Sequence, residues 1–384
     1  MADHAVLSAS GSHIWLACPP SVKLSENFPD TASFSASEGT FAHALAELEL
    51  NNFFGNIAQS YYKKEHRKMT RNEFYSRGMT EYVDEYVQMV IQKYQEMCPL
   101  DHTTKVYIEQ RLDFGRWVPG GFGTGDAVIV GNHTVEVCDL KYGKHVQVSA
   151  EGNSQLRLYG LGAYAEYDWL ENIERIRMTI CQPRCGGISS EELSAKELLE
   201  WGRKIVPVAM QAIKGEGEVK AGEHCRFCRA ANRCKALADY RLSLAKYEFR
   251  NALLLSDEEV ADILNKVDGL VSYANSIKDY ALEEAVNGRR WPGYKLVEGR
   301  SQRKFSDEAS IVQVLTAHGV EKEKLYKPRA LIGITAMSSL IGKKMFDECL
   351  SQFVVRPTGR PTLVPEDDKR PEFSSAASDF TDLG

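Results

Sequence analysis

Residues 105–141 constrain the fold most, because the spacing of apolar residues changes there from helical to strand-like. Short β-branched runs alternate with glycine-rich turns, and the runs are Val106 with Ile108, residues 128–130, and Val135 with Val137. Such runs between turns are typical of consecutive antiparallel strands. A further apolar run predicts a strand over residues 175–182. The predicted fold class is therefore α/β, with a sheet set among helices.

Helices are predicted on both sides of this segment. Apolar residues recur at helical spacing over residues 40–50, 77–95 and 155–167. Ser12 is expected to cap a short turn that Pro19 and Pro20 end. Capping boxes, in which glutamate follows serine after three residues, occur at Ser194 with Glu197 and at Ser256 with Glu259. The first of these two helices is expected to kink at Pro207, and the second to stop at Gly288.

The composition is that of a folded protein. Of 384 residues, 43% are hydrophobic and 26% are charged, which excludes wholesale disorder. No signal peptide is recognisable, and the longest apolar stretch, residues 330–342, is too short and polar to cross a bilayer, so we expect a soluble, cytoplasmic protein without a membrane partner. We divide the chain into a helical region over 1–100, a core over 101–220, a cysteine-rich segment over 221–245, a second helical region over 246–360 and a disordered tail over 361–384.

The charge distribution leaves nucleic acid open as a partner. A net charge of −6, from 47 basic and 53 acidic residues, excludes a histone-like polycation but not an enzyme with a local basic surface. Residues 61–71 carry five basic residues against one acidic residue, and residues 288–304 carry six against one. The second stretch includes Trp291 and Tyr294 and adjoins Phe305, aromatic side chains that can stack on unpaired bases. We favour it as a DNA contact; the alternative is a solvated basic loop.

Two carboxylates and a lysine mark a candidate site in the strand region. Asp139 and Lys141 are two residues apart, so on a strand they share a face. Asp126 begins the preceding strand, and a short hairpin can bring it beside Asp139. Such a set suits Mg²⁺ or Mn²⁺, with the lysine holding or deprotonating the attacking water. Taken alone, an Asp-x-Lys sequence is more often a solvated strand edge.

Two helical pairs flank this segment. His43 and Glu47 lie four residues apart on one helix face upstream, within the sequence that begins at Glu38. Gln155 and Tyr159 share a face of the next helix downstream. Each pair by itself is ordinary amphipathic patterning. Their order around Asp126 and Lys141 is what points to a catalytic site.

The cysteines point to a metal or cluster site. Nine cysteines are an odd number for a disulfide framework, and three of them, Cys225, Cys228 and Cys234, fall within ten residues. A fourth ligand is needed, and Cys18 is the candidate. Four cysteines fit either Zn²⁺ or a [4Fe–4S] cluster, and the alternative of buried, unligated thiols is weak for so dense a group.

The order of these motifs resembles the RecB-type branch of the PD-(D/E)XK nuclease superfamily. The cysteine pattern resembles its iron–sulfur subfamily, which includes the AddB nuclease domain and CRISPR-adaptation exonucleases. Over most of its length, including residues 7–12 and 293–301, the chain looks like an uncharacterised family of such nucleases encoded by phages and prophages. The resemblance implies an α+β, mixed-sheet, restriction-endonuclease-like core with helical additions at both ends. Gly125 rather than proline precedes Asp126, and the second acidic residue is aspartate.

Residue roles follow from the resemblance. It assigns the catalytic Mg²⁺ or Mn²⁺ to the side chains of His43, Asp126 and Asp139 and the carbonyl of Leu140. In this assignment Lys141 positions the attacking water. Gln155 and Tyr159 orient the strand that carries the lysine and the DNA backbone. It assigns a [4Fe–4S] cluster to Cys18, Cys225, Cys228 and Cys234, with Zn²⁺ as the alternative.

The function implied is a divalent-metal-dependent DNA exonuclease of phage replication or recombination. Its substrates would be linear or single-stranded DNA ends in the bacterial cytoplasm, and a phage single-strand-binding or annealing protein would be a partner. One alternative is a catalytically inactive DNA-binding or scaffolding protein on the same fold, which the presence of His43, Asp126, Asp139 and Lys141 disfavours. Another is a zinc-binding interaction module on an unrelated core, which explains the cysteines but not the motif order.

Overall fold

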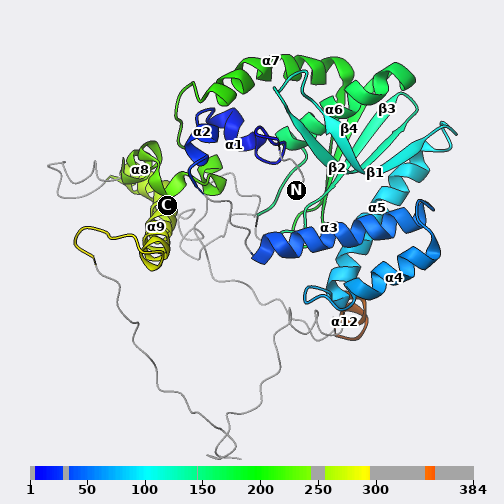
Figure 1. Ribbon diagram of the computed structural model, residues 1–384, viewed down its shortest axis with the longest axis horizontal. Helices are drawn as coiled ribbons and strands as arrows, with labels where there is room; N and C mark the ends of the chain where they lie inside the picture. The colour runs from blue at the N-terminus through cyan, green and yellow to red at the C-terminus, as the bar shows by residue number, and fades with distance from the viewer. Residues whose placement is uncertain (1–4, 29–33, 145, 244–255, 295–341, 351–384) are drawn as a thin grey trace, which may run out of the picture.

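The computed structural model describes residues 5–28, 34–144, 146–243, 256–294 and 342–350. In this part of the chain helices flank one five-stranded sheet (Figure 1). Its strands pair in chain order and are β1 (Lys105–Asp113), β2 (Phe122–Gly131), β3 (Thr134–Leu140), β4 (Arg175–Gln182) and β5 (Gly187–Ser194). The α/β class predicted from the sequence is confirmed.

Along the chain, the helices fall into a group before the first strand, one helix between β3 and β4, and a group after β5. In chain order they are α1 (Ser12–Ala17), α2 (Ser21–Ser25), α3 (Phe34–Phe53), α4 (Gln59–Met69), α5 (Arg77–Met97), α6 (Ser154–Glu171), α7 (Ala195–Lys214), α8 (Lys235–Arg241), α9 (Asp257–Val286) and α12 (Lys343–Leu350). Short 3₁₀ turns, η1 (Glu223–Phe227) and η2 (Ala231–Arg233), precede α8.

The sheet is mixed in direction. The first three strands form the antiparallel meander that the β-branched runs predict, and β5 pairs antiparallel with β4. β3 and β4 are parallel, so the chain between them must cross over, and α6 forms this crossover. Every residue of β3 is buried, which makes this strand the centre of the sheet.

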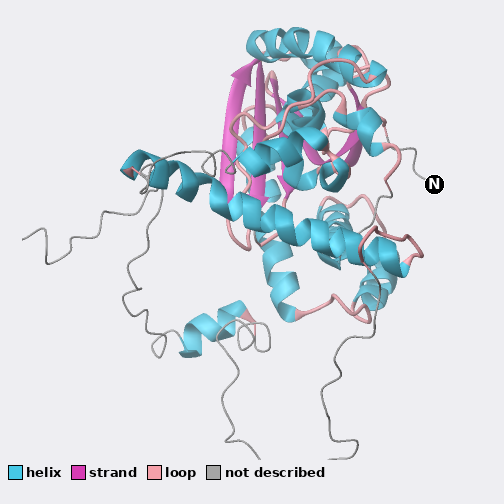
Figure 2. Cartoon of the chain, turned by 90° about the vertical axis from the view of Figure 1, so that its left-hand side faces the viewer, coloured by secondary structure: helices cyan, strands magenta, loops and turns pink. Residues whose placement is uncertain are grey.

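Helices cover both faces of the sheet, because alternate strand residues point to opposite sides. Val128 and Val130 belong to one apolar core, which includes residues of α6 and α7. Ala127 and Ile129 belong to the other, which includes residues of α3 and α5. Figure 2 shows the strands side by side with helices packed against them. The end of β3 therefore lies between two packed layers.

The predicted capping boxes are present. Ser194 and Glu197 exchange hydrogen bonds at the start of α7, and Ser256 and Glu259 do so at the start of α9. Pro207 lies inside α7 without ending it. Gly288 follows α9 with a φ of 95°, in the left-handed region that glycine adopts readily, as a stop at that position requires.

The prediction that Ser12 caps the first helix is wrong. Gly11 occupies the cap position, and no side chain caps α1. Ser12 is instead buried in the first turn, and its hydroxyl lies 2.6 Å from that of Ser154 at the start of α6. A buried hydroxyl needs a hydrogen-bond partner, so a tertiary contact decides the place of this serine.

Some boundaries also differ from the predictions. α3 begins at Phe34 rather than near residue 40, and β2 begins at Phe122, so Asp126 lies within the strand and not at its start. Residues 295–304 of the predicted basic segment and the predicted tail over 361–384 lie outside the described residues. No helix in the described ranges has both the length and the apolar character needed to cross a membrane.

Candidate active site

The end of β3 brings together an acid, a lysine and a glutamine. Asp139 is only 2% exposed, and the Lys141 ammonium lies 2.9 Å from its Oδ2. Lys141 Nζ also donates a hydrogen bond to Gln155 Oε1 at 2.9 Å. Lysine has three N–H donors, so these two contacts hold the ammonium in place and leave one donor for another ligand.

Asp126 lies on the neighbouring strand beside Asp139. Ala127 pairs with Cys138 in the register of β2 and β3, which sets the two aspartates next to each other. The backbone N–H of Leu140 donates to Asp126 Oδ2 at 2.8 Å. The hairpin thus brings Asp126, Asp139 and the Leu140 backbone to one place.

His43 reaches this place from the other layer. Its Nδ1 lies 3.2 Å from Asp126 Oδ1, across the interface between α3 and β2. Burial acts to lower the pKa of His43, but the hydrogen bond and charge of Asp126 outweigh it, and the pKa is raised. Glu47, one turn further along α3, is exposed.

Gln155 and Tyr159 come from the first turns of α6. Gln155 Nε2 donates to Asp139 Oδ1 at 3.3 Å and to the Tyr159 hydroxyl at 3.2 Å. Burial raises the pKa of Tyr159, so its hydroxyl stays protonated. Its ring packs so closely on Gly123 that a Cβ there would lie 2.7 Å from it. A glycine on β2 is therefore what lets Tyr159 approach the site.

Glu109, for which the sequence predicts no role, completes the cluster. Glu109 on β1 offers a carboxylate oxygen within 4.8 Å of ligand atoms of both His43 and Asp126. Its backbone has a φ of 51°, in the left-handed region that is uncommon for residues other than glycine. Burial, followed by the charge of Asp126, raises the pKa of Glu109 to about 7. The feature that points to Glu109 is its position opposite Asp126 in the pairing of β1 with β2.

This cluster opens into a pocket of about 400 Å³ between α3 and the first two strands. The lining residues are Ala36, Gly39, Thr40, His43, Glu109, Thr124 and Asp126. The pocket gives a ligand a route to the acidic side chains from the α3 side.

The donor set fits a divalent cation. Burial is the first cause of the raised pKa of Asp139, and the Asp126 charge adds to it against the opposing charge of Lys141. Asp139 Oδ2 has Lys141 as an ion-pair neighbour but no partner in hydrogen-bond geometry among the described residues. An under-satisfied buried carboxylate oxygen beside a second carboxylate and an imidazole suits Mg²⁺ or Mn²⁺.

The four predicted cluster cysteines also gather in one place, and all are free thiols. Burial raises the pKa of Cys18, and the thiols of Cys228 and Cys234 raise it further. The same two residues and Cys18 all add to the raised pKa of Cys225, again after burial. Such charge effects weaken with distance, so the four sulfurs are neighbours. α1 contacts η1, which carries Cys225.

A family model described as "Protein of unknown function (DUF2800)" matches residues 4–371. The chain belongs to this family. Membership agrees with the prediction of an uncharacterised family. A solved structure titled "Crystal structure of SSO0001" is similar at 14% identity over 62% of this chain and 89% of that chain. Its TM-score of 0.28 is too low to carry a conclusion about the fold.

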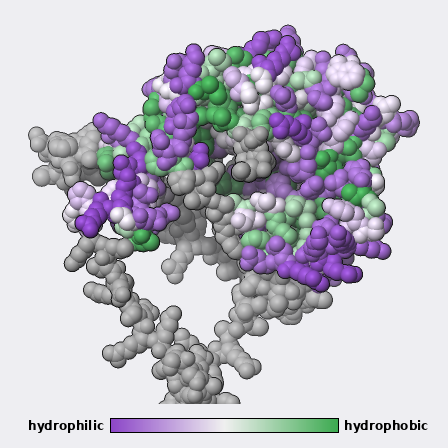
Figure 3. All heavy atoms as spheres, viewed as in Figure 1, coloured by the Kyte–Doolittle hydropathy of each residue, from purple (hydrophilic) through white to green (hydrophobic). Residues whose placement is uncertain are grey.

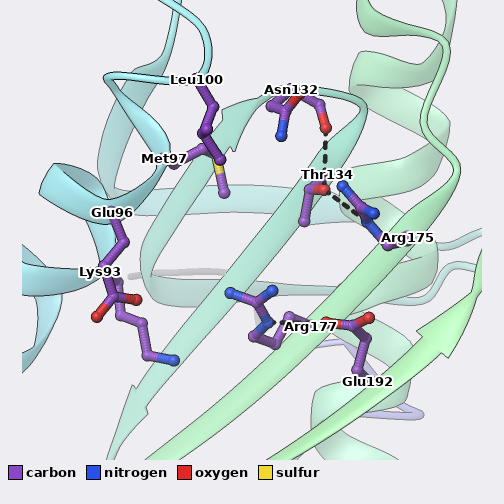
Figure 4. A pocket seen from close by; sticks show the side chains of 9 residues that line it. All are labelled: Lys93, Glu96, Met97, Leu100, Asn132, Thr134, Arg175, Arg177 and Glu192. Atoms are coloured by element: carbon purple, nitrogen blue, oxygen red, sulfur yellow. Dashed lines mark hydrogen bonds and ion pairs between the residues drawn. The ribbon is translucent and has the colours of Figure 1, made fainter.

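A second pocket in this family member, of about 250 Å³, lies at the opposite end of β3 and β4 (Figure 4). Glu136, fully buried, forms ion pairs with Lys93 at 3.6 Å and with Arg177 at 3.0 Å, and accepts a hydrogen bond from Thr179. Arg175 on the pocket rim donates to Thr134. These contacts satisfy the charges within the sheet, and the pocket is separate from the acidic cluster.

The two basic stretches differ in their surroundings. Residues 61–69 of the first stretch form most of exposed α4, where Figure 3 shows hydrophilic side chains gathered at the lower right. In the other stretch, Trp291 donates to the Ala281 carbonyl of α9, and its ring also lies beside Arg289. Tyr294 is 84% exposed. Of the predicted stacking residues that the structure describes, only Tyr294 is freely accessible.

Proposed function

We propose that this protein is a divalent-metal-dependent DNA exonuclease on a PD-(D/E)XK core. The observation that carries the proposal is the convergence of Asp126, Asp139 and Lys141 at the end of β3, with Lys141 held by both Asp139 and Gln155. Residues from three separate segments meet at one partly open place, which a solvated strand edge would not require.

The roles of the side chains follow from their contacts. Asp126 and Asp139, with His43, would hold the cation, which when bound offsets charge on the phosphate. Lys141 keeps one N–H donor beyond its two protein contacts and would hold the attacking water with it. Gln155 holds the lysine in place by accepting a hydrogen bond from its ammonium, and Gln155 in turn donates a hydrogen bond to the Tyr159 hydroxyl.

We further propose that the four cysteines hold a structural [4Fe–4S] cluster. The thiols of these residues act on one another's pKa values, as neighbours do. Four cysteine ligands fit a [4Fe–4S] cluster as well as Zn²⁺. The resemblance to the iron–sulfur subfamily is what favours the cluster.

The remaining parts of the proposal rest on the resemblance. They are action on linear or single-stranded DNA ends, a role in phage replication or recombination in the host cytoplasm, and a single-strand-binding or annealing protein as partner. Exposed α4, with its four lysine and arginine residues, supports DNA as the substrate because binding to phosphates needs local positive charge.

The decisive experiment measures cleavage of end-labelled DNA by anaerobically purified protein with Mg²⁺ or Mn²⁺. Linear, closed-circular and single-stranded forms of one sequence are compared. Asp139→Ala is the test variant, and Glu151→Gln, in an exposed turn, is the matched control. Cleavage that needs the metal and Asp139 but not Glu151 supports the proposal. Binding without cleavage would favour the inactive DNA-binding alternative.

A further inference from the structure

The pocket of about 250 Å³ at the far end of β3 and β4 gathers positive charge. Among the described residues, Lys93, Arg175 and Arg177 are the cationic side chains that line it. Glu136 lies fully buried beneath, with Lys93 at 3.6 Å from one of its oxygens and Arg177 at 3.0 Å from the other. One buried carboxylate thus holds two cations side by side, and Arg175 adds a third positive charge.

These cations keep hydrogen-bond donors for a ligand. Arg177 uses Nη1 for Glu136 and Nε for Glu192, so its Nη2 has no partner in the described ranges. Arg175 donates from Nε to Thr134 and forms no ion pair within those ranges, which leaves both of its terminal nitrogens. The planar fork of a guanidinium group matches the oxygens of a phosphate.

The acids at the rim offset this charge only weakly. Glu96 and Glu192 are both exposed, and water weakens the effect of exposed charges. The side chain of Lys93 is 19% exposed and that of Arg177 is 31% exposed, against 46% for Glu192. The excess positive charge suits a dianion better than a carboxylate, and a phosphate monoester carries about −1.5 to −2 at pH 7.

The other end of the pocket suits a nucleobase. Figure 4 shows Met97 and Leu100 on the α5 side and Asn132 beside them, away from the Lys93 ammonium. A thioether packs favourably on an aromatic ring. The Asn132 side-chain amide has no partner among the residues that the structure describes. An amide supplies donors and an acceptor, which is how asparagine pairs with the edge of adenine.

We propose that this pocket binds a nucleoside monophosphate. The phosphate lies against Lys93, Arg175 and Arg177. The base lies against the apolar α5 wall, with its polar edge toward Asn132. A volume of about 250 Å³ is below the usual range for drug-sized ligands, which favours a single nucleotide. The inference goes beyond the proposed function, because the acidic cluster lies at the opposite end of the strands and shares no residue with this pocket.

The test measures binding of deoxyadenosine monophosphate to the full-length protein by calorimetry. A chelator is present, so that no cation at the acidic cluster can recruit the phosphate. The wild type is expected to bind one nucleotide per chain, and to bind inorganic phosphate or deoxyadenosine at least about tenfold more weakly. Arg175→Gln should weaken nucleotide binding by about tenfold or more, the usual effect of losing a charge-assisted hydrogen bond. Arg175 is exposed, so this variant should fold.

Two further variants separate the base from the phosphate and control for lost charge. Leu100→Ser removes apolar surface that is 70% exposed, and should weaken nucleotide binding by about threefold without changing phosphate binding. Arg203→Gln removes an exposed arginine on α7 and should change neither. No nucleotide binding by the wild type, or equal binding by Arg175→Gln, would overturn the inference and leave the proposed cleavage standing. Inorganic phosphate bound as tightly as the nucleotide would overturn the nucleoside assignment.

Discussion

Two groups of side chains are assembled in contrasting ways. One is the acidic row, Glu109, Asp126 and Asp139, and the other is the cysteine group, Cys18, Cys225, Cys228 and Cys234. The acidic residues come from adjacent strands whose register is fixed by ladder hydrogen bonds, and α6 supplies Gln155 from a long packed helix. The cysteines come from the end of six-residue α1 and from two 3₁₀ turns and their flanks. Cys18 and Cys234 are roughly 200 residues apart in sequence.

This contrast concerns what holds each site together before any ligand binds. Sheet register orients the acidic residues independently of a metal, at the cost of crowding like charges. Short helices and turns have few internal hydrogen bonds, so the segments that carry the cysteines depend for their arrangement on the proposed cluster that links them. We expect loss of an acidic residue to abolish cleavage and leave the fold intact, and loss of a cysteine to destabilise the fold itself.

The largest expected effect is on cleavage. Asp139→Ala or Lys141→Ala should lower the rate of metal-dependent DNA cleavage by about 100-fold or more, the usual contribution of a positioned proton-transfer or water-holding group. Circular dichroism and the melting temperature should show a folded protein. Undiminished cleavage by a clean Asp139→Ala preparation would remove this residue from the site.

The second prediction concerns the cluster. Anaerobically purified wild type should be brown and contain iron and sulfide in equal amounts. Cys18→Ala should lose the colour and most of its solubility, because closing so long a loop constrains the unfolded chain. Cys98→Ala, at the end of α5, is the matched control and should keep both. A colourless preparation with stoichiometric zinc would contradict the iron assignment.

The third prediction concerns DNA ends. Linear DNA should be degraded faster than the same DNA as a closed circle, since the proposed enzyme starts at ends. The comparison uses one plasmid before and after a single cut. Equal initial rates on the two forms would indicate an endonuclease. The proposed role of Asp126 and Asp139 in holding the cation would not change.

The smallest expected effect is on stability against pH. The pKa of Glu109 is raised from 4.5 to about 7 in the folded protein, so folding disfavours its charged form. The penalty is absent below pH 4.5, grows as the pH rises, and is complete above about pH 7. Metal-free Glu109→Gln should therefore melt a few degrees above wild type at pH 8, with little difference at pH 4.5. Scanning calorimetry in a chelator measures this, and an equal gap at both pH values would contradict it.

Much of the fold was predictable because local signals agree with tertiary structure there. The valines of β2 and β3 and the capping boxes at Ser194 and Ser256 lie where the sequence predicts. The sequence does not predict β5, because this edge strand consists mostly of serines and glutamates, is partly solvated and has no apolar run. Exposed α4 likewise has no buried residue to give it an apolar stripe.

The candidate site was predictable where short-range geometry decides it. Asp139 and Lys141 are two residues apart on one strand, and Gln155 and Tyr159 are one helical turn apart, so their meeting follows from local periodicity. Glu109 depends on the register of β1 against β2 and on one distorted residue, neither of which the spacing of apolar residues encodes. Its role is visible only after the strands are paired.

The Ser12–Ser154 hydroxyl pair connects the two regions that we have contrasted. Ser12 starts α1, which leads to Cys18, and Ser154 is directly followed by Gln155, which holds Lys141. The position of α1, and with it the cysteine end, is therefore tied by one pair of hydroxyls to the first turn of α6, which holds the lysine.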